Sequence, residues 1–186
     1  MKIILASKSP RRQELLKQIG IEFEVLDVDI DESWDGHESA QDYVRRVALE
    51  KARSGKAMTD KNRPLLAADT AVVLNGQILG KAETSDDAIA MLERLSGKTH
   101  EVYTAVTVVT AQEHTRLNIS KVTFKDLNQK EINDYCNTGE PVGKAGGYAI
   151  QGRAAVFIER LEGSYSGVMG LPLYETMNLL LQTSET

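Results

Sequence analysis

The chain has 186 residues, of which 41% are hydrophobic and 26% are charged, as in one soluble domain of medium size or two small lobes that share a core. Its 27 acidic and 22 basic residues give a net charge of -5, which argues against a nucleic-acid-binding protein but leaves room for a local basic pocket. No apolar run is long enough for a membrane span or a signal peptide, and the single cysteine excludes an intramolecular disulfide, so we expect a cytoplasmic protein without a membrane partner.

Apolar, β-rich runs alternate with amphipathic helical patterns along the chain. This alternation predicts an α/β fold with a mixed, partly antiparallel sheet flanked by helices. Strands are expected at residues 2–7, 22–31, 65–74, 77–80, 101–110, 115–126 and 154–161. Helices are expected at residues 9–19, from 39 to about 54, from 84 to near 97, from 128 to 139, and after Pro172. Capping-box sequences that begin at Ser39 and Thr84 support two of these helix starts.

The first predicted strand leads through a turn with two serines, Ser7 and Ser9, into a helix that begins with Pro10. A strand followed by a helix N-terminus is a common phosphate-binding arrangement, because backbone N–H groups and the helix dipole attract an anion. Arg11 and Arg12 lie in the first helical turn, where each positive charge costs roughly 0.3–1 kcal/mol if nothing compensates it. The local sequence therefore leaves two interpretations, solvated surface arginines or a phosphate-binding site.

Two charged residues interrupt apolar patterns. Asp69 lies in the run L-L-A-A-D-T-A-V-V-L, and a carboxylate in a buried strand is costly without a partner. We therefore expect Asp69 to face a cation or a metal, as a general base or a metal ligand. Lys51 lies on the apolar stripe of the helix that follows Ser39, and it either extends to water or points into a pocket. Lys81 is either a surface residue or a second cation at the same end of the sheet.

Residues 27–38 have the length and acidic spacing of an EF-hand loop, but Glu32 occupies the position that requires glycine. Aspartates alternate here with Val28 and Ile30, which favours a strand. Its acidic end offers Asp31 and Glu32 as ligands for Mg²⁺.

Two glycine-rich segments, residues 139–152 and 163–172, are either ordinary loops or places where the backbone approaches a ligand. Within the first segment, Gln151 has both a donor and an acceptor with which to read a nucleobase edge. The three histidines show no zinc-ligand spacing, and Cys136 is expected in the core.

Several short motifs occur in order along the chain: S-K-S-P-R-R (7–12), E-K-A (50–52), A-A-D-T (67–70), L-G-K (79–81), S-G-K-T-H-E-V-Y-T-A (96–105), Y-A-I-Q-G (148–152) and G-S-Y-S-G-V-M-G-L-P (163–172). Together they resemble the Maf family of nucleoside triphosphate pyrophosphatases over essentially the whole chain. The resemblance implies one domain over residues 1–186, with two lobes around a central cleft as an option. It also implies a deep substrate cleft and a fold related to the inosine triphosphate pyrophosphatases.

The resemblance further implies hydrolysis of a nucleoside triphosphate to the monophosphate and pyrophosphate, with Mg²⁺ or Mn²⁺ as cofactor. The phosphate-binding residues would be Ser7, Arg11, Arg12, Lys51 and Lys81. Asp69 would orient or deprotonate the water that attacks the α-phosphorus, and it would share the metal with Glu32. Asp29 and Asp31 compete with Glu32 for the metal role.

The substrate branch also follows from the resemblance. Thr70 after the aspartate, and Gln151 in the late loop, resemble the branch that acts on dTTP and UTP, including modified pyrimidine nucleotides in a house-cleaning role. The branch that prefers 7-methyl-GTP typically has glutamine and an acidic residue at these two positions. Arg12, Thr70 and Gln151 would then set specificity. The alternative is a nucleotide-binding regulator of cell division, an inhibitor of septum formation with little turnover, and a homodimer is compatible with either function.

Overall fold

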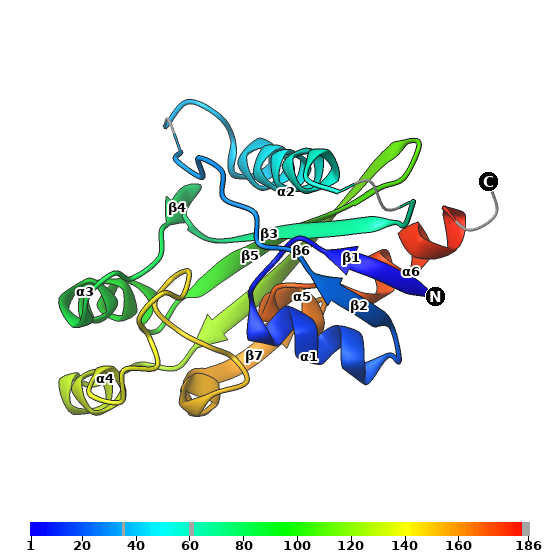
Figure 1. Cartoon of the computed structure of the whole chain (residues 1–186). Helices are drawn as coiled ribbons and strands as arrows, with labels where there is room; N and C mark the ends of the chain where they lie inside the picture. Colours follow the sequence, from blue (N-terminus) through cyan, green and yellow to red (C-terminus); the bar gives the residue numbers. More distant parts are fainter. Residues whose placement is uncertain (35, 60–61, 184–186) are drawn as a thin grey trace. The chain divides into compact units, whose positions relative to one another are not determined.

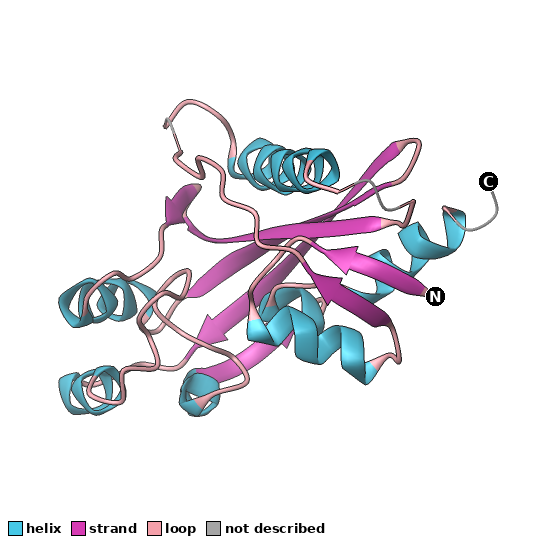
Figure 2. Ribbon diagram, viewed as in Figure 1, coloured by secondary structure: helices cyan, strands magenta, loops and turns pink. Residues whose placement is uncertain are grey.

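A computed structural model describes residues 1–34, 36–59 and 62–183 of the chain (Figure 2). The strands are β1 (Lys2–Leu5), β2 (Glu22–Val25), β3 (Leu65–Leu74), β4 (Gln77–Leu79), β5 (Thr99–Val109), β6 (Glu113–Phe124) and β7 (Ile158–Glu162). The helices are α1 (Pro10–Gln18), α2 (Ala40–Ala57), α3 (Ser85–Leu95), α4 (Gln129–Cys136), α5 (Tyr165–Met169) and α6 (Leu173–Gln182), with a 3₁₀ helix η1 (Arg153–Phe157).

Within the described ranges, the strands form one seven-stranded sheet in the order β2-β1-β3-β5-β6-β7, with β4 paired to β3. β1 runs parallel to both β2 and β3, whereas the β3–β4 and β6–β7 pairs are antiparallel. The mixed sheet with flanking helices confirms the fold class that the sequence predicts. No helix in the described part of the chain has both the length and the apolar character needed to cross a bilayer.

The chain divides into two compact units. Unit 1 contains Met1–Asp69, Thr104–Asn118 and Gly170–Thr186, and unit 2 contains Thr70–Tyr103 and Ile119–Met169. β3 passes from the first unit to the second between Asp69 and Thr70.

In unit 1, helix α2 lies over the sheet (Figure 1), and the residues it buries are mostly apolar. The helix begins after Ser39, whose hydroxyl accepts a hydrogen bond from the Asp42 N–H at 3.2 Å, as its capping sequence predicts. The helix lies close to the sheet at Gly55, where a Cβ atom would meet the Leu65 side chain at 3.0 Å. A buried cluster surrounds this contact, made of Ile4, Ala6, Ala52, Leu65, Ala67 and Val109. This packing fixes one face of α2 against the strand that carries Asp69.

In unit 2, α3 and α4 each begin with a complete capping box, at Thr84 and Asn128 respectively. An aromatic cluster is buried in this unit, where the rings of His100, Phe124 and Tyr148 contact one another edge to face. The Nε2 atom of His100 lies 2.7 Å from the Tyr148 hydroxyl. Cys136 is buried, as expected for a core cysteine.

Three expected elements differ from the sequence pattern. The strand predicted at 22–31 ends at Val25, and residues 26–34 have no regular structure. The strand predicted at 154–161 begins as η1 and becomes β7 only at Ile158. The glycine-rich segment 163–172 contains the short helix α5. Asp35, which belongs to the acidic run, lies outside the described residues.

Candidate active site

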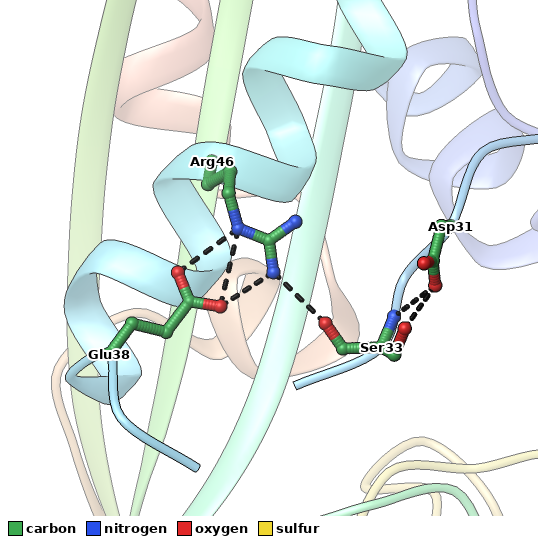
Figure 3. Close-up of a pocket in the computed structure, with 4 residues that line it drawn as sticks. All are labelled: Asp31, Ser33, Glu38 and Arg46. Atoms are coloured by element: carbon green, nitrogen blue, oxygen red, sulfur yellow. Dashed lines mark hydrogen bonds and ion pairs between the residues drawn. The ribbon is translucent and has the colours of Figure 1, made fainter. Parts of the chain in front are cut away.

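A pocket of about 430 Å³ is lined by Asp31, Ser33 and Glu38, which lie between β2 and α2, and by Arg46 of α2 (Figure 3). The carboxylate of Asp31 accepts hydrogen bonds from the hydroxyl and, at 2.9 Å, from the N–H of Ser33, and these bonds lower the pKa of Asp31. The Trp34 indole N–H donates to the Glu38 carbonyl at 3.0 Å. Asp31 is therefore engaged within its own segment.

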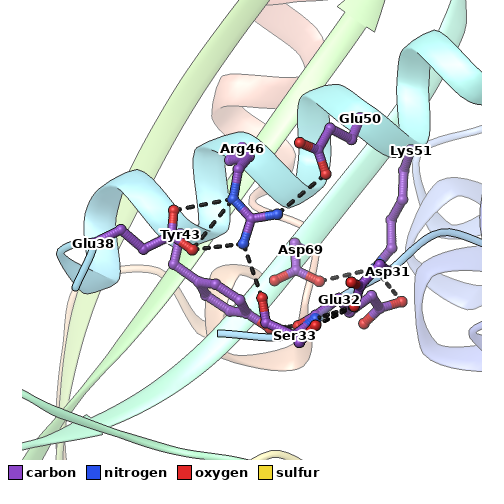
Figure 4. A network of polar contacts seen from close by, with 9 residues as sticks. All are labelled: Asp31, Glu32, Ser33, Glu38, Tyr43, Arg46, Glu50, Lys51 and Asp69. Atoms are coloured by element: carbon purple, nitrogen blue, oxygen red, sulfur yellow. Dashed lines mark hydrogen bonds and ion pairs between the residues drawn. The ribbon is translucent and has the colours of Figure 1, made fainter. Parts of the chain in front are cut away.

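Lys51 joins this segment to the buried strand β3 (Figure 4). Its Nζ lies 2.9 Å from Oδ1 of Asp69 and 2.9 Å from Oε1 of Glu32. The side chains of Lys51 and Asp69 are only 10% and 7% exposed, so Lys51 points inward and does not extend to water. Among the three acidic candidates, Glu32 is the one whose carboxylate reaches Lys51, while Asp29 and Asp31 are exposed.

Burial raises the pKa of Asp69, while the positive charges of Lys51 and Arg12 oppose that rise. Burial also raises the pKa of the neighbouring phenol of Tyr43 to about 12, together with the negative charges of Asp69 and Glu32. The charges of these groups therefore act on one another within unit 1. A buried carboxylate with a raised pKa is suited to accept a proton near neutral pH.

Arg12 is held at the start of α1 by two acceptors. Its Nε donates to the Gly170 carbonyl at 2.8 Å, and its Nη1 donates to the Ser7 hydroxyl at 3.1 Å. The Ser7 oxygen also accepts the Ser9 N–H at 3.2 Å. Burial lowers the pKa of Arg12 and the charge of Arg11 adds to this effect, whereas Asp69 and Glu32 raise it. The positive charge that is unfavourable for the helix dipole is thus compensated by the two carboxylates.

The carboxylates that could hold a divalent cation beside Lys51 are those of Glu32 and Asp69. Among the described residues, no group of three or more His, Cys, Asp or Glu side chains is arranged to hold a metal ion. Mg²⁺ is commonly bound through one or two carboxylates together with substrate phosphates and waters. Glu32 and Asp69, bridged by one ammonium group, fit such a site, which the phosphates of a substrate would complete.

The remaining predicted residues lie in unit 2. Thr70 follows Asp69 along β3, and Lys81 forms a β-bridge with Ala145 in the first glycine-rich segment. Gln151 is exposed, although the three residues before it are buried. The structure therefore brings Ser7, Arg12, Glu32, Lys51 and Asp69 together in unit 1, next to Arg11, and places Lys81 and Gln151 in the second unit.

Two side chains anchor the backbone on both sides of Gln151. The Tyr135 hydroxyl accepts the Ala149 N–H at 3.2 Å and donates to Glu140 at 2.9 Å. Both carboxylate oxygens of Glu140 accept the Arg153 N–H, at 3.0 and 3.1 Å. Burial and the nearby Glu140 carboxylate raise the pKa of Tyr135, so its hydroxyl stays protonated as a donor.

Sequence reasoning missed several residues that support these groups, namely Tyr43, Arg46, Tyr135, Glu140 and Gly170. Tyr43, Arg46 and Tyr135 each contact a backbone atom of a segment that has no regular structure, and no periodic pattern in the sequence predicts such contacts. The glycine-rich pattern around Gly170 was visible, but nothing in it indicated that this carbonyl holds Arg12.

The chain thus combines a mixed sheet with an ion-paired cluster of Asp69, Lys51 and Glu32. The family model described as "Maf-like protein" matches residues 2–183, and the chain belongs to the Maf family, which confirms the resemblance seen in the sequence. A relative from Alkalilimnicola ehrlichii, named dTTP/UTP pyrophosphatase, is 53% identical over 96% of this chain and 91% of its own. A relative from Methylococcus capsulatus with the same name is 52% identical over 97% of this chain and 90% of its own.

Among solved structures, the Staphylococcus aureus Ham1 protein has a TM-score of 0.51 and 14% identity, and the match covers 78% of this chain and 81% of that one. At this level of identity the likeness concerns the fold.

Proposed function

We propose that this protein hydrolyses dTTP and UTP, and modified pyrimidine triphosphates, to the nucleoside monophosphate and pyrophosphate. The observation that carries the proposal is the buried Asp69, whose carboxylate is held 2.9 Å from Lys51 beside Glu32. Relatives that share about half of its residues over nearly the whole chain are named dTTP/UTP pyrophosphatases, which supports the same substrates.

In the proposed reaction, Asp69 orients or deprotonates the water that attacks the α-phosphorus, and pyrophosphate leaves. Its raised pKa supports this role, because a carboxylate base works best when its pKa approaches the working pH. Arg11, Arg12, Lys51 and Lys81 neutralise the phosphates. Ser7 already accepts two hydrogen bonds through its oxygen, so its own proton is available to donate to a phosphate oxygen.

A divalent cation, Mg²⁺ or Mn²⁺, would be held by Glu32 and Asp69 and would supply charge neutralisation on the phosphates. The protein residues provide the fixed positions that make this useful, because phosphoryl transfer depends mainly on positioning and electrostatic stabilisation.

Selection of the nucleobase is proposed for Arg12, Thr70 and Gln151. Thr70 directly follows Asp69, the proposed general base, along β3. Gln151 is exposed on a backbone segment that is anchored on both sides. Its side-chain amide can donate to and accept from one pyrimidine edge at once. We further propose that the protein acts in the cytoplasm. A homodimer and the absence of a nucleic-acid partner are predictions from the sequence.

The test is a product assay with dTTP, UTP, CTP and purine triphosphates in the presence of Mg²⁺ or Mn²⁺. We expect monophosphate and pyrophosphate in equal amounts, with the highest kcat/KM for dTTP and UTP. Asp69→Asn should lower kcat by roughly 10²–10⁴-fold, the usual effect of losing a general base.

Release of orthophosphate would contradict the proposed bond cleavage, and full activity of Asp69→Asn would contradict the assignment of the base. Tight binding of a triphosphate with no cleavage would favour the regulatory alternative.

A further inference from the structure

The backbone of the Glu32 segment is held by two side chains of α2, which lie three residues apart on that helix. The Tyr43 hydroxyl donates to the Glu32 carbonyl at 2.8 Å. The Nη2 atom of Arg46 donates to the next carbonyl, that of Ser33, at 3.0 Å (Figure 4). Two successive carbonyls fixed in this way set the orientation of the peptide groups on both sides of Ser33.

Arg46 is itself firmly oriented. Its Nε donates to both carboxylate oxygens of Glu38, at 3.2 and 3.0 Å, and its Nη1 donates to Glu50 at 3.2 Å. The guanidinium carbon lies 5.6 Å from the centre of the Tyr43 ring, within the range of a cation–π contact. Because Glu38 lies in the same segment as Glu32, Arg46 joins this segment to α2 at two places, Ser33 and Glu38.

The same helix supplies Lys51, which contacts the Glu32 carboxylate at 2.9 Å. Residues 26–34 have no regular structure, so the sheet does not position Glu32. The side chains of Tyr43 and Arg46 meet the backbone of this segment at Glu32 itself and at the next residue. The buried face of α2 fixes that helix against the core and makes it a rigid base for these supports.

We propose that Tyr43 and Arg46 are positioning residues, which hold the Glu32 carboxylate opposite Asp69 so that the two can share a divalent cation. This inference rests on the proposed function. Partners that orient a metal ligand typically contribute 10- to 100-fold to metal affinity or activity, so loss of either support should have an effect of that size.

The experiment measures Mn²⁺ binding directly, by the loss of the free Mn²⁺ EPR signal, without nucleotide and with a non-hydrolysable dTTP analogue. The variants are Tyr43→Phe, which removes only the hydroxyl, and Arg46→Lys, which keeps the charge but cannot hold Glu38 and Ser33 together. Arg45→Lys is the matched control, since Arg45 is exposed on the same helix. Glu32→Gln provides the reference for a lost metal ligand.

We expect Tyr43→Phe and Arg46→Lys to weaken Mn²⁺ binding by roughly 10-fold or more. Their kcat should recover at saturating Mn²⁺, because the chemistry itself is intact, and Arg45→Lys should match the wild type. A purely structural role would instead lower the melting temperature and reduce kcat at every Mn²⁺ concentration.

Tyr43→Phe and Arg46→Lys could bind Mn²⁺ as tightly as the wild type while Glu32→Gln binds it weakly. That result would overturn the positioning role of Tyr43 and Arg46 but would leave the metal role of Glu32 intact. Unchanged Mn²⁺ binding in Glu32→Gln would overturn it as well, by removing the metal role of Glu32. The product assay of the proposed function would still stand or fall by itself.

Discussion

The ammonium group of Lys51 lies 2.9 Å from the Asp69 carboxylate and at the same distance from that of Glu32, so one cation is shared by two acids. Arg12 adds a second positive charge that acts electrostatically on both acids. The charges of Lys51 and Arg12 thus oppose those of Asp69 and Glu32 within unit 1. A divalent cation between the carboxylates would replace Lys51 as their partner and free its ammonium group for the phosphates.

Lys51→Met should therefore bind Mn²⁺ more tightly than the wild type in the absence of nucleotide, although it should hydrolyse dTTP more slowly. Removal of one partner of a buried ion pair costs roughly 3–5 kcal/mol of stability. Added Mn²⁺ should therefore raise the melting temperature of Lys51→Met by more than it raises that of the wild type. The measurements are Mn²⁺ titration by EPR and melting temperature against Mn²⁺ concentration. Lys56→Met, on the same helix, controls for the change in net charge, and weaker Mn²⁺ binding in Lys51→Met would contradict the exchange.

Ser7→Ala should reduce kcat/KM for dTTP by roughly 10- to 100-fold, because a hydrogen bond to a charged group contributes roughly 1.5–3 kcal/mol. The lost hydroxyl is one of two acceptors that hold the Arg12 guanidinium. Steady-state kinetics with dTTP would measure the effect, and Ser54→Ala, which removes a hydroxyl on α2, is the control. Equal losses in both variants would show that Ser7 has no special role.

Tyr135→Phe should make the enzyme less selective for dTTP and UTP over other triphosphates. The variant loses the hydroxyl that joins Ala149 to Glu140, so the backbone that carries Gln151 loses one anchor. Misplacement of a binding group by about 1 Å can cost roughly 10²-fold. The ratio of kcat/KM values for UTP and CTP reports this, with Tyr174→Phe as an exposed control, and an unchanged ratio would argue against anchoring of Gln151.

The stability of the protein should fall in mild acid because of His100. Burial lowers the pKa of His100 to about 4, whereas an unfolded histidine has a pKa of about 6.5. Below pH 6.5 the unfolded chain therefore takes up a proton that the folded protein does not, and stability is lost progressively from pH 6.5 down to pH 4. The full loss is roughly 3 kcal/mol.

Urea unfolding of the wild type and His100→Gln at pH 7.5 and pH 5 would measure this effect. The glutamine amide can still meet the Tyr148 hydroxyl but does not titrate, so the variant should lose less stability between the two pH values. Carboxylate titration is common to both proteins and cancels in the comparison. An identical acid-induced loss in both would assign the effect elsewhere.

The features that depend on neighbouring residues in the sequence could be predicted from the sequence alone. The strand around Asp69 has the predicted bounds, since a ten-residue apolar run has few alternatives, and the helix starts after Ser39, Thr84 and Asn128 follow from their side-chain caps. The sequence did not decide whether Lys51 points into the protein or extends to water, because a lysine on an apolar stripe can do either.

Strand ends depend on partners that lie far away in the sequence. The alternation after Val25 continues, but β1 is only four residues long and pairs with Glu22–Val25. The Leu26 N–H still donates to the Leu5 carbonyl at 2.9 Å, and residues 27–31 then extend past the end of β1. In the same way, β6 ends at Phe124, opposite Ile158, and the residues before Ile158 coil into η1. The contacts that position Glu32 could not be predicted for a related reason, because Tyr43 donates a hydrogen bond to a backbone carbonyl of this segment, which has no regular structure.

Trp34 is the only tryptophan of the chain, and its indole N–H is bonded to the Glu38 carbonyl inside the segment that carries Glu32. Its side chain is partly exposed, so its emission responds to local polarity and to quenchers. The native protein thus contains an intrinsic fluorophore two residues from a proposed metal ligand. Selective excitation of the indole would follow the arrival of a metal or a nucleotide in real time, without a label and without turnover.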